Sequence, residues 1–232
     1  MPASALVFAG GVFSKNTLQW VAAAAKQADV WCADSGLEHA VRHGFTVKVV
    51  VGDCDSVSQA SLDDAVAQGA KLVKHRADKN ASDLELTLKE LIDAGYSEVT
   101  VLAASGGRTD HALFNWLLML QQDWPFALTV VDETISAYLV HSNVSFSAEL
   151  PPSTTLSLLC RESVSGVTTA GMKYPLRDAR LMGGSTLGLS NEVAGSANES
   201  NSGRTSASVP VNVQVSAGRL LVCVVHNELL KI

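Results

Sequence analysis

The chain has 232 residues, of which 47% are hydrophobic and 17% charged, and its net charge is −6. This length suits one large domain or two small ones with a sizeable core. The negative balance excludes a general electrostatic attraction to nucleic acid. Residues 1–13 lack a basic leader region and form too short an apolar run to cross a membrane. We therefore interpret them as containing the first strand and expect no membrane or nucleic-acid partner.

The four cysteines are far apart in the sequence and form no C-x-x-C pair. Such spacing is typical of reduced, mostly buried thiols rather than of a disulfide framework or a metal finger. We therefore expect a cytoplasmic protein.

Short apolar runs alternate with amphipathic segments through the first 132 residues. Strands are expected at Ala5–Phe8, Val30–Ala33, Val47–Val51, Lys71–Val73, Val99–Ala103 and Leu128–Val131. Helices are expected between them, at Thr17–Gln27, Leu37–His43, Ser58–Gln68, Ser82–Ala94 and Asp110–Gln122. Ser82 and Glu85 form a capping-box pattern at the fourth helix. Six strands with intervening helices predict an α/β domain with a doubly wound, mostly parallel sheet.

The pattern changes after about Thr134, where no convincing helix follows. Alternating runs predict strands at Val144–Ala148, Thr155–Cys160, Val209–Val215 and Leu220–Val225. In the run Val209–Val215 valine occupies every odd position, which is the period of a half-buried strand. The C-terminal part is therefore expected to be an antiparallel β-sandwich. We place the domain boundary between residues 134 and 135, giving domains 1–134 and 135–232.

Acidic or glycine-rich clusters follow four of the predicted strands. They are Ala33–Gly36 (ADSG), Gly52–Ser56 (GDCDS), Asp78–Asp83 (DKNASD) and Gly106–His111 (GGRTDH). In a parallel sheet the carboxyl ends of the strands share one edge, so these loops should converge on one crevice. Carboxylates gathered there repel one another unless a cation neutralises them, and Mg²⁺ suits an all-oxygen site beside a phosphate. The clusters indicate a metal-dependent enzyme that acts on phosphates.

The carboxylates differ in how strongly each one points to a metal. Asp53 and Asp55 are two residues apart in a loop, a spacing that lets both bracket one cation, although an Asx-turn with an Asp N-cap has the same pattern. Asp34 fits a plain strand-to-helix turn equally well. Asp83 follows the N-cap Ser82, where a carboxylate also complements the helix dipole.

The glycine-rich cluster has features of a phosphate-binding loop. Gly106 and Gly107 permit close approach of backbone to a phosphate, and Arg108 offers a planar fork for its oxygens. The loop lacks the G-K-[ST] ending of a Walker A motif. Asp110 begins the next helix, and His111 suits either a nucleotide contact or a hydrogen bond at the helix start. Lys79, in the loop before the fourth helix, could meet a phosphate as a point charge.

Two histidines, His39 and His43, are four residues apart on a predicted helix and share a face. No H-E-x-x-H order and no third ligand accompany them, so we interpret this face as solvated rather than metal-binding.

Taken in order, the clusters resemble those of the thiamine pyrophosphokinases. The matching strings are ADSG at 33–36, GDCDS at 52–56, DKNASDLE at 78–85, GGRTDHALFN at 106–115, GMKYPL at 171–176 and GLSNE at 188–192. The ordered set spans nearly the whole chain and is far more specific than any one string. The chain departs from the family pattern at Cys54, where an aromatic residue is common, and at Asn80, where an aspartate is common.

The resemblance implies a Mg²⁺-dependent transfer of the pyrophosphoryl group of ATP to the thiamine hydroxyl, giving thiamine diphosphate and AMP. It implies an α/β domain followed by a β-sandwich, in a homodimer whose active sites lie near the interface. The family match assigns Mg²⁺ to Asp53, Asp55 and Asp83, with help from Asp34. It assigns ATP and its phosphates to Lys79, Gly107, Arg108, His111 and Asn115, and thiamine to Ser190, Asn191 and Glu192. Either Asp110 or Asp34 would accept the proton of the alcohol.

Three alternatives remain open at this level. A related diphosphokinase would use another alcohol, such as a hydroxymethyl pterin, although the GMKYPL and GLSNE strings speak against it. A Mg²⁺-dependent phosphohydrolase would use Asp53 as a nucleophile and need no alcohol. A module that binds nucleotide or thiamine without catalysis would not need all the acidic clusters.

Overall fold

A computed structural model describes residues 3–76, 80–195 and 208–226, with no side-chain detail at positions 23 and 24. It divides into two compact units, Met1–Leu118 with Trp124–Glu133 and Met119–Asp123 with Thr134–Ile232. None of the helices within the described ranges combines the length and the apolar character that crossing a bilayer requires.

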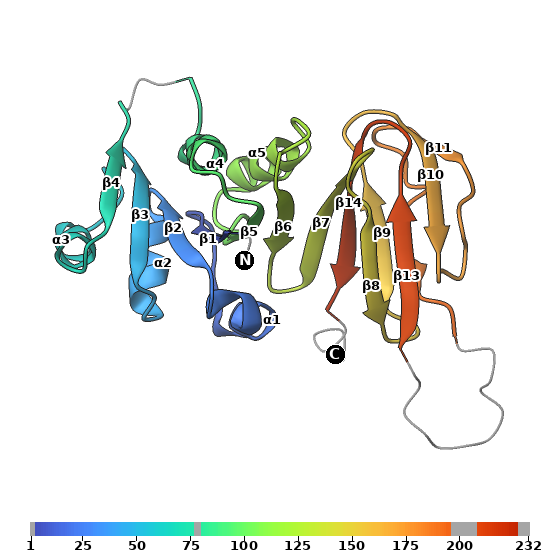
Figure 1. Cartoon of the computed structure of the whole chain (residues 1–232), viewed down its shortest axis with the longest axis horizontal. Helices are drawn as coiled ribbons and strands as arrows, with labels where there is room; N and C mark the ends of the chain where they lie inside the picture. Colours follow the sequence, from blue (N-terminus) through green and yellow to red (C-terminus); the bar gives the residue numbers. More distant parts are fainter. Residues whose placement is uncertain (1–2, 77–79, 196–207, 227–232) are drawn as a thin grey trace, which may run out of the picture. The chain divides into compact units, whose positions relative to one another are not determined.

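The first unit contains the parallel sheet that the sequence predicts. Its strands are β1 (Ser4–Phe8), β2 (Asp29–Ala33), β3 (Val47–Gly52), β4 (Lys71–Lys74), β5 (Glu98–Leu102) and β6 (Ala127–Val131). All of their pairings are parallel, in the order β6-β5-β1-β2-β3-β4. The chain builds outward from β1 to β4 and then crosses to the other side of β1 to form β5. The topological switch point therefore lies between β1 and β5 (Figure 1).

Helices cover both faces of this sheet. They are α1 (Lys15–Ala25), α2 (Gly36–Arg42), α3 (Gln59–Ala67), α4 (Asp83–Asp93) and α5 (Thr109–Met119). The first three contribute to one apolar cluster around Leu6 and Phe8 of β1. Figure 1 shows α4 and α5 on the other side of the parallel strands from α1 and α2. The amphipathic pattern of α4 is realised, because Leu84, Leu88 and Leu91 are all buried.

The second unit is antiparallel throughout its described strands. One sheet has the order β12-β9-β14-β7 and the other the order β11-β10-β13-β8. The strands are β7 (Ile135–His141), β8 (Phe146–Leu150), β9 (Thr155–Leu159), β10 (Val164–Ala170), β11 (Ala179–Leu181), β12 (Asn191–Glu192), β13 (Val209–Gln214) and β14 (Arg219–Val225). Residues of both sheets form one buried core cluster, as in a sandwich. The predicted fold class is confirmed.

Four of these strands were absent from the sequence prediction: β7, β10, β11 and β12. The strand β7 has five buried residues out of seven, so it shows no alternation of apolar and polar residues. The strand β10 contains a shift of register between Val164 and Val167, with Gly166 at a positive φ of 67°. The strands β11 and β12 have only three and two residues, so pairing rather than local pattern defines them.

Candidate functional site

Three carboxylates meet at the carboxyl edge of the parallel sheet. One ligand oxygen from each of Asp34, Asp53 and Asp55 lies within 4.8 Å of the others. Asp34 follows β2, while Asp53 and Asp55 follow β3, so the parallel arrangement of neighbouring strands brings them together. The backbone amide of Asp55 donates to Asp53 Oδ1 at 3.2 Å, which forms the Asx-turn that the spacing also allows. The turn and the carboxylate cluster therefore coexist.

Asp83 lies beside this cluster, at the start of α4. A Cβ placed on Gly52 would lie 2.9 Å from Asp83 Oδ1 and 3.2 Å from Asp34 Cβ. Gly52 also has a φ of 149°, which side chains rarely adopt. Glycine at the end of β3 therefore lets the Asp83 carboxylate and the Asp34 backbone approach closely.

Asp34 has an environment that suits a cation. Its Oδ1 is buried and has no hydrogen-bond partner among the described residues. Burial, and then the negative charges of Asp83 and Asp53, raise the pKa of Asp34. A buried, unpaired carboxylate oxygen is costly, and a bound metal ion would satisfy it. Oxygen donors from several carboxylates are the ligand set that Mg²⁺ takes, so the residues present fit this ion.

Within the described part of the first unit, the non-glycine residues with positive φ lie at the same edge. Asp34, Cys54 and Ala103 have positive φ values of 45°, 61° and 55°, and they follow β2, β3 and β5 respectively. Positive φ costs free energy for residues other than glycine, and such strain is typical of functional sites. Cys54 is a half-buried free thiol, and burial followed by the charge of Asp34 raises its pKa.

A cavity of about 210 Å³ opens beside the carboxylates at the switch point. Residues that follow β1, β2, β3 and β5 line it together with the starts of α4 and α5. They include Gly10, Gly11, Asp34, Ser56, Asp83, Gly106, His111 and Asn115. The cavity therefore contains four of the predicted site residues: Asp34, Asp83, His111 and Asn115. It also contains Gly10 and Gly11, which are not among the predicted site residues, although two adjacent glycines shortly after a strand are a usable signal.

Asn115 and Arg108 have different roles in the structure as it stands. The Asn115 amide donates to the carbonyl oxygen of Ala104 at 2.9 Å, which ties α5 to the segment after β5. The Arg108 guanidinium pairs with Asp110, with Nη2 2.6 Å from Oδ2 and Nε 3.2 Å from Oδ1. Arg108 lowers the pKa of Asp110 to about 2. Both side chains are exposed, and Asp110 is not a member of the carboxylate cluster.

Gly107 is exposed, with a φ of 63° and open space where a Cβ would stand. Lys79, the other predicted phosphate ligand, lies outside the described residues.

The predicted thiamine residues lie in the second unit. The amide of Ser190 donates to Ser157 Oγ at 3.0 Å, and Asn191 and Glu192 form β12 against β9 rather than a surface turn. The Asn191 side chain donates to the carbonyl oxygen of Tyr174 at 2.8 Å and accepts from the Tyr174 amide at 3.2 Å. Glu192 pairs with Lys173 at 3.0 Å. The GMKYPL and GLSNE strings are therefore held side by side.

The interpretation of His39 and His43 as a solvated face was wrong. Both side chains are half-buried, and both rings pack near Phe13, with centroid distances of 6.0 Å and 5.0 Å. The segment after β1 folds back over α2, so a helix face that looks open in the sequence is covered.

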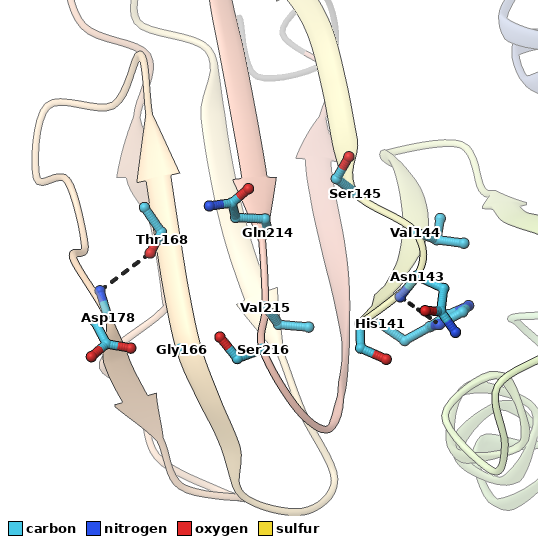
Figure 2. A pocket seen from close by; sticks show the side chains of 11 residues that line it. His141, Asn143, Val144, Ser145, Gly166, Thr168, Asp178, Gln214, Val215 and Ser216 are labelled. Atoms are coloured by element: carbon cyan, nitrogen blue, oxygen red, sulfur yellow. Dashed lines mark hydrogen bonds between the residues drawn. The ribbon is translucent and has the colours of Figure 1, made fainter.

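A second cavity, of about 430 Å³, lies in the second unit (Figure 2). Its lining is mostly hydroxyl and amide side chains, such as Ser145, Thr168 and Gln214, with Asp178 and His141 as the titratable groups. No arginine or lysine lines it, and none of the predicted site residues does. The basic groups that a phosphate ligand favours are therefore missing from this cavity.

An acidic cavity at the switch point of a doubly wound sheet defines a class of protein that binds phosphate compounds at the ends of its strands. Comparisons with known proteins identify the family. The model of the thiamin pyrophosphokinase catalytic domain matches residues 22–128, and that of its vitamin B1 binding domain matches residues 142–202. The chain belongs to the thiamine pyrophosphokinase family and is an enzyme of the thiamine diphosphokinase type.

Individual relatives agree with this assignment. The thiamine pyrophosphokinase of Bacillus subtilis (strain 168) is 23% identical over 198 residues, which cover 81% of this chain and 88% of the relative. A crystal structure of thiamine pyrophosphokinase from Bacillus subtilis gives a TM-score of 0.74 at 19% identity, covering 96% of this chain and 98% of that one. The thiamin pyrophosphokinase of Candida albicans gives 0.72 at 14% identity, covering 96% and 90%. At these identities the structural matches show the fold alone.

Proposed function

We propose that this protein transfers the pyrophosphoryl group of ATP to the hydroxyl of thiamine, with Mg²⁺, giving thiamine diphosphate and AMP. Family membership supports the reaction class. The observation that carries the proposal is the buried Oδ1 of Asp34, which has no hydrogen-bond partner among the described residues and belongs to an acidic cluster at the switch point. In this proposal residues 1–134 form the catalytic domain and residues 135–232 the thiamine-binding domain.

Asp34, Asp53, Asp55 and Asp83 would hold the metal ion. When bound, Mg²⁺ would neutralise negative charge on the phosphates of ATP. The protein supplies a fixed arrangement of oxygens, because Asp34 and Asp83 stand close to the backbone of Gly52 and the amide of Asp55 orients Asp53. These contacts reduce the reorganisation that would otherwise accompany binding.

The reaction requires attack of the thiamine oxygen on the β-phosphorus, cleavage of the bond to the α-phosphate oxygen, and removal of the hydroxyl proton. Arg108 and Lys79 would donate to phosphate oxygens, with Gly107, His111 and Asn115 near the nucleotide. Asp34 and Asp110 remain the candidate proton acceptors. Arg108 engages both oxygens of Asp110, so Asp110 would become available to the alcohol only as Arg108 turned to a phosphate.

The remaining parts of the proposal concern thiamine, assembly and location. Ser190, Asn191 and Glu192 would contact thiamine, with the Asn191 amide already committed to the backbone of Tyr174. We propose a homodimer with active sites near its interface, which sedimentation equilibrium would test against the chain mass of 24.4 kDa. Four free thiols support a reducing, cytoplasmic location.

A product assay tests the function. The purified protein is incubated with ATP, Mg²⁺ and thiamine, and AMP and thiamine diphosphate are quantified together. We expect equal amounts of both, and loss of both when Mg²⁺ is omitted. Phosphate release without thiamine would favour a phosphohydrolase, and turnover only with a hydroxymethyl pterin would favour a related diphosphokinase. Either result would overturn the proposal.

A further inference from the structure

The turn that follows β1 is tied to the segment that follows β5. The amide of Ala9 donates to the Leu102 carbonyl at 2.9 Å, that of Gly11 to Ala103 at 2.8 Å, and that of Val12 to Ser105 at 2.7 Å. These two segments flank the switch point, where the cavity beside the carboxylates opens. The position of one segment therefore depends on the position of the other.

The β1 turn also fits too closely for any side chain. A Cβ on Gly10 would lie 2.4 Å from Ser35 Oγ, and one on Gly11 would lie 2.2 Å from the carbonyl oxygen of Ser105. Both glycines line the cavity. In the segment after β5, a Cβ on Gly106 would lie 2.5 Å from Val12 Cγ2. The β1 turn therefore packs directly against the start of the Gly106–Arg108 loop.

The ring of His39, on α2, is hydrogen-bonded to the backbone carbonyl group of Gly11 in this turn. Its Nε2 lies 2.7 Å from the carbonyl oxygen of Gly11 and must donate, since a carbonyl only accepts. The other ring nitrogen, Nδ1, is buried and has no partner among the described residues. The ring therefore has a single polar contact in the described structure, and that contact is with a residue of the cavity wall.

We propose that His39 is a positioning residue for the nucleotide: it fixes Gly11 and, through Val12 and Gly106, the backbone that receives the phosphates of ATP. The inference rests on the proposed function and adds to it a residue outside the cavity. His39 does not line the cavity, so its effect on ATP is transmitted through the Gly11 carbonyl. Displacement of such a backbone cradle weakens binding and orientation of the bound substrate.

His43, the C-cap residue of α2, provides a matched control. It is half-buried and packs near the same Phe13 ring, but its Nδ1 donates to the carbonyl oxygen of His39, one turn back along the chain. His39→Leu and His43→Leu make the same small change in side-chain volume, and only the first leaves the Gly11 carbonyl without its donor. His39→Gln keeps an amide donor at the position and serves as the conservative variant.

Steady-state kinetics of the whole enzyme with Mg²⁺ test the proposal. We expect His39→Leu to raise the KM for ATP about tenfold, the loss expected when one hydrogen bond is left unmade. The KM for thiamine should stay within about twofold, His43→Leu should resemble the wild type, and His39→Gln should recover most of the loss. Equal effects of His39→Leu and His43→Leu on the KM for ATP would overturn the inference.

Amide hydrogen exchange gives a second readout that does not depend on turnover. His39→Leu should speed exchange in the segments 9–12 and 103–107, and His43→Leu should leave both segments near the wild-type rate. Unchanged exchange in His39→Leu would overturn the positioning role. If the wild type makes no thiamine diphosphate, the proposed function fails, and the exchange comparison still decides whether His39 fixes the turn.

Discussion

The two carboxylates at opposite ends of β2 have opposite electrostatic environments. Asp29, at the amino end, accepts hydrogen bonds from Lys48 Nζ and from the Tyr96 hydroxyl, each at 2.6 Å. Burial would raise the pKa of Asp29, but these two bonds lower it below its ordinary value. Asp34, at the carboxyl end, has a raised pKa because of burial and the charge of Asp83. The fold therefore stabilises the negative charge of Asp29 and destabilises that of Asp34.

Neutralising each aspartate should therefore change stability in opposite directions. When folding raises the pKa of a carboxyl group, that group stabilises the fold at pH values below its unfolded-state pKa of 3.8. This stabilisation is lost as the pH rises through the higher pKa of the folded state. Asp34→Asn should raise the melting temperature of the metal-free protein at neutral pH, and the gain should shrink as the pH falls towards 3.8. Folding lowers the pKa of Asp29, so this group stabilises the fold above pH 3.8, and the stabilisation is lost as the pH falls through the lowered pKa. Asp29→Asn should lower the melting temperature at neutral pH.

Thermal unfolding in chelator, followed from neutral to acidic pH, measures both variants. A lower melting temperature for Asp34→Asn at neutral pH would contradict the conclusion that the fold disfavours the charged form of Asp34. Each change should be modest, as for most single substitutions, on the order of 1 kcal/mol or less.

Asp53 and Asp55 should matter to activity rather than to folding. Asp53→Asn or Asp55→Asn should lower turnover on the order of a hundredfold, because a group that positions charge against the phosphates is lost. Asp63→Asn is the control, since Asp63 lies on α3 and its carboxylate contacts Gln59 on the helix surface. Turnover with Mg²⁺ titration measures the effect, and near-normal rates with unchanged Mg²⁺ dependence would exclude these residues from metal binding.

At the scale of the element, α4 is the helix that brings the site together. Its N-cap Ser82 accepts a hydrogen bond from the Glu85 amide at 3.2 Å, as the capping-box pattern predicts. Ser82, Asp83 and Leu84 all line the cavity. The same cap geometry occurs at α3, where Ser58 accepts from the Ser61 amide at 3.2 Å, away from the cavity lining.

These two caps form a matched pair of variants. Ser82→Ala and Ser58→Ala should each cost about 1 kcal/mol of stability, which is typical for loss of an N-cap. Only Ser82→Ala should also lower kcat/KM for ATP, because fraying of the first turn displaces Asp83. Denaturant unfolding and steady-state kinetics on both variants check this expectation. Similar activity losses in the two variants would show that the effect is one of stability alone.

For the molecule as a whole, the two units have separate hydrophobic cores, and the tryptophan residues belong to only one of the units. All four tryptophans, Trp20, Trp31, Trp116 and Trp124, lie in the first unit. Tryptophan fluorescence therefore reports on unfolding of the unit that contains the carboxylate cluster, which makes ligand binding to that unit directly measurable.

Mg²⁺ together with a non-hydrolysable ATP analogue should raise the melting temperature seen by tryptophan fluorescence. At a ligand concentration of about 100 Kd the expected stabilisation is about 2.7 kcal/mol. The shift should be several degrees for a chain of this size. Asp53→Asn should lose the part of the shift that depends on Mg²⁺, and Asp63→Asn should keep it. The absence of any shift in the wild type would contradict nucleotide binding to the first unit.

Local pattern was sufficient for much of the fold. Each predicted strand and helix of the first unit is present, with boundaries that differ by a few residues, because apolar periodicity and caps such as Ser82 act within a few residues of themselves. The acidic strings after β2 and β3 could likewise be placed on one edge, since parallel strands share their carboxyl ends. The short strands β11 and β12 could not be predicted from the sequence, because they form only by pairing with other strands of the folded domain.

The order of apolar runs and acidic strings is thus enough to predict the fold class and the strand ends that carry carboxylates. The partners of the individual side chains follow from the folded structure. It buries Asp34 Oδ1 where none of the described residues gives it a hydrogen bond, joins Arg108 to Asp110, and places His39 against the Gly11 carbonyl. Backbone preferences act between residues that are near in the sequence, so the sequence pattern reveals them. Burial, charge pairing and close packing depend on segments that meet only after the sheet has formed.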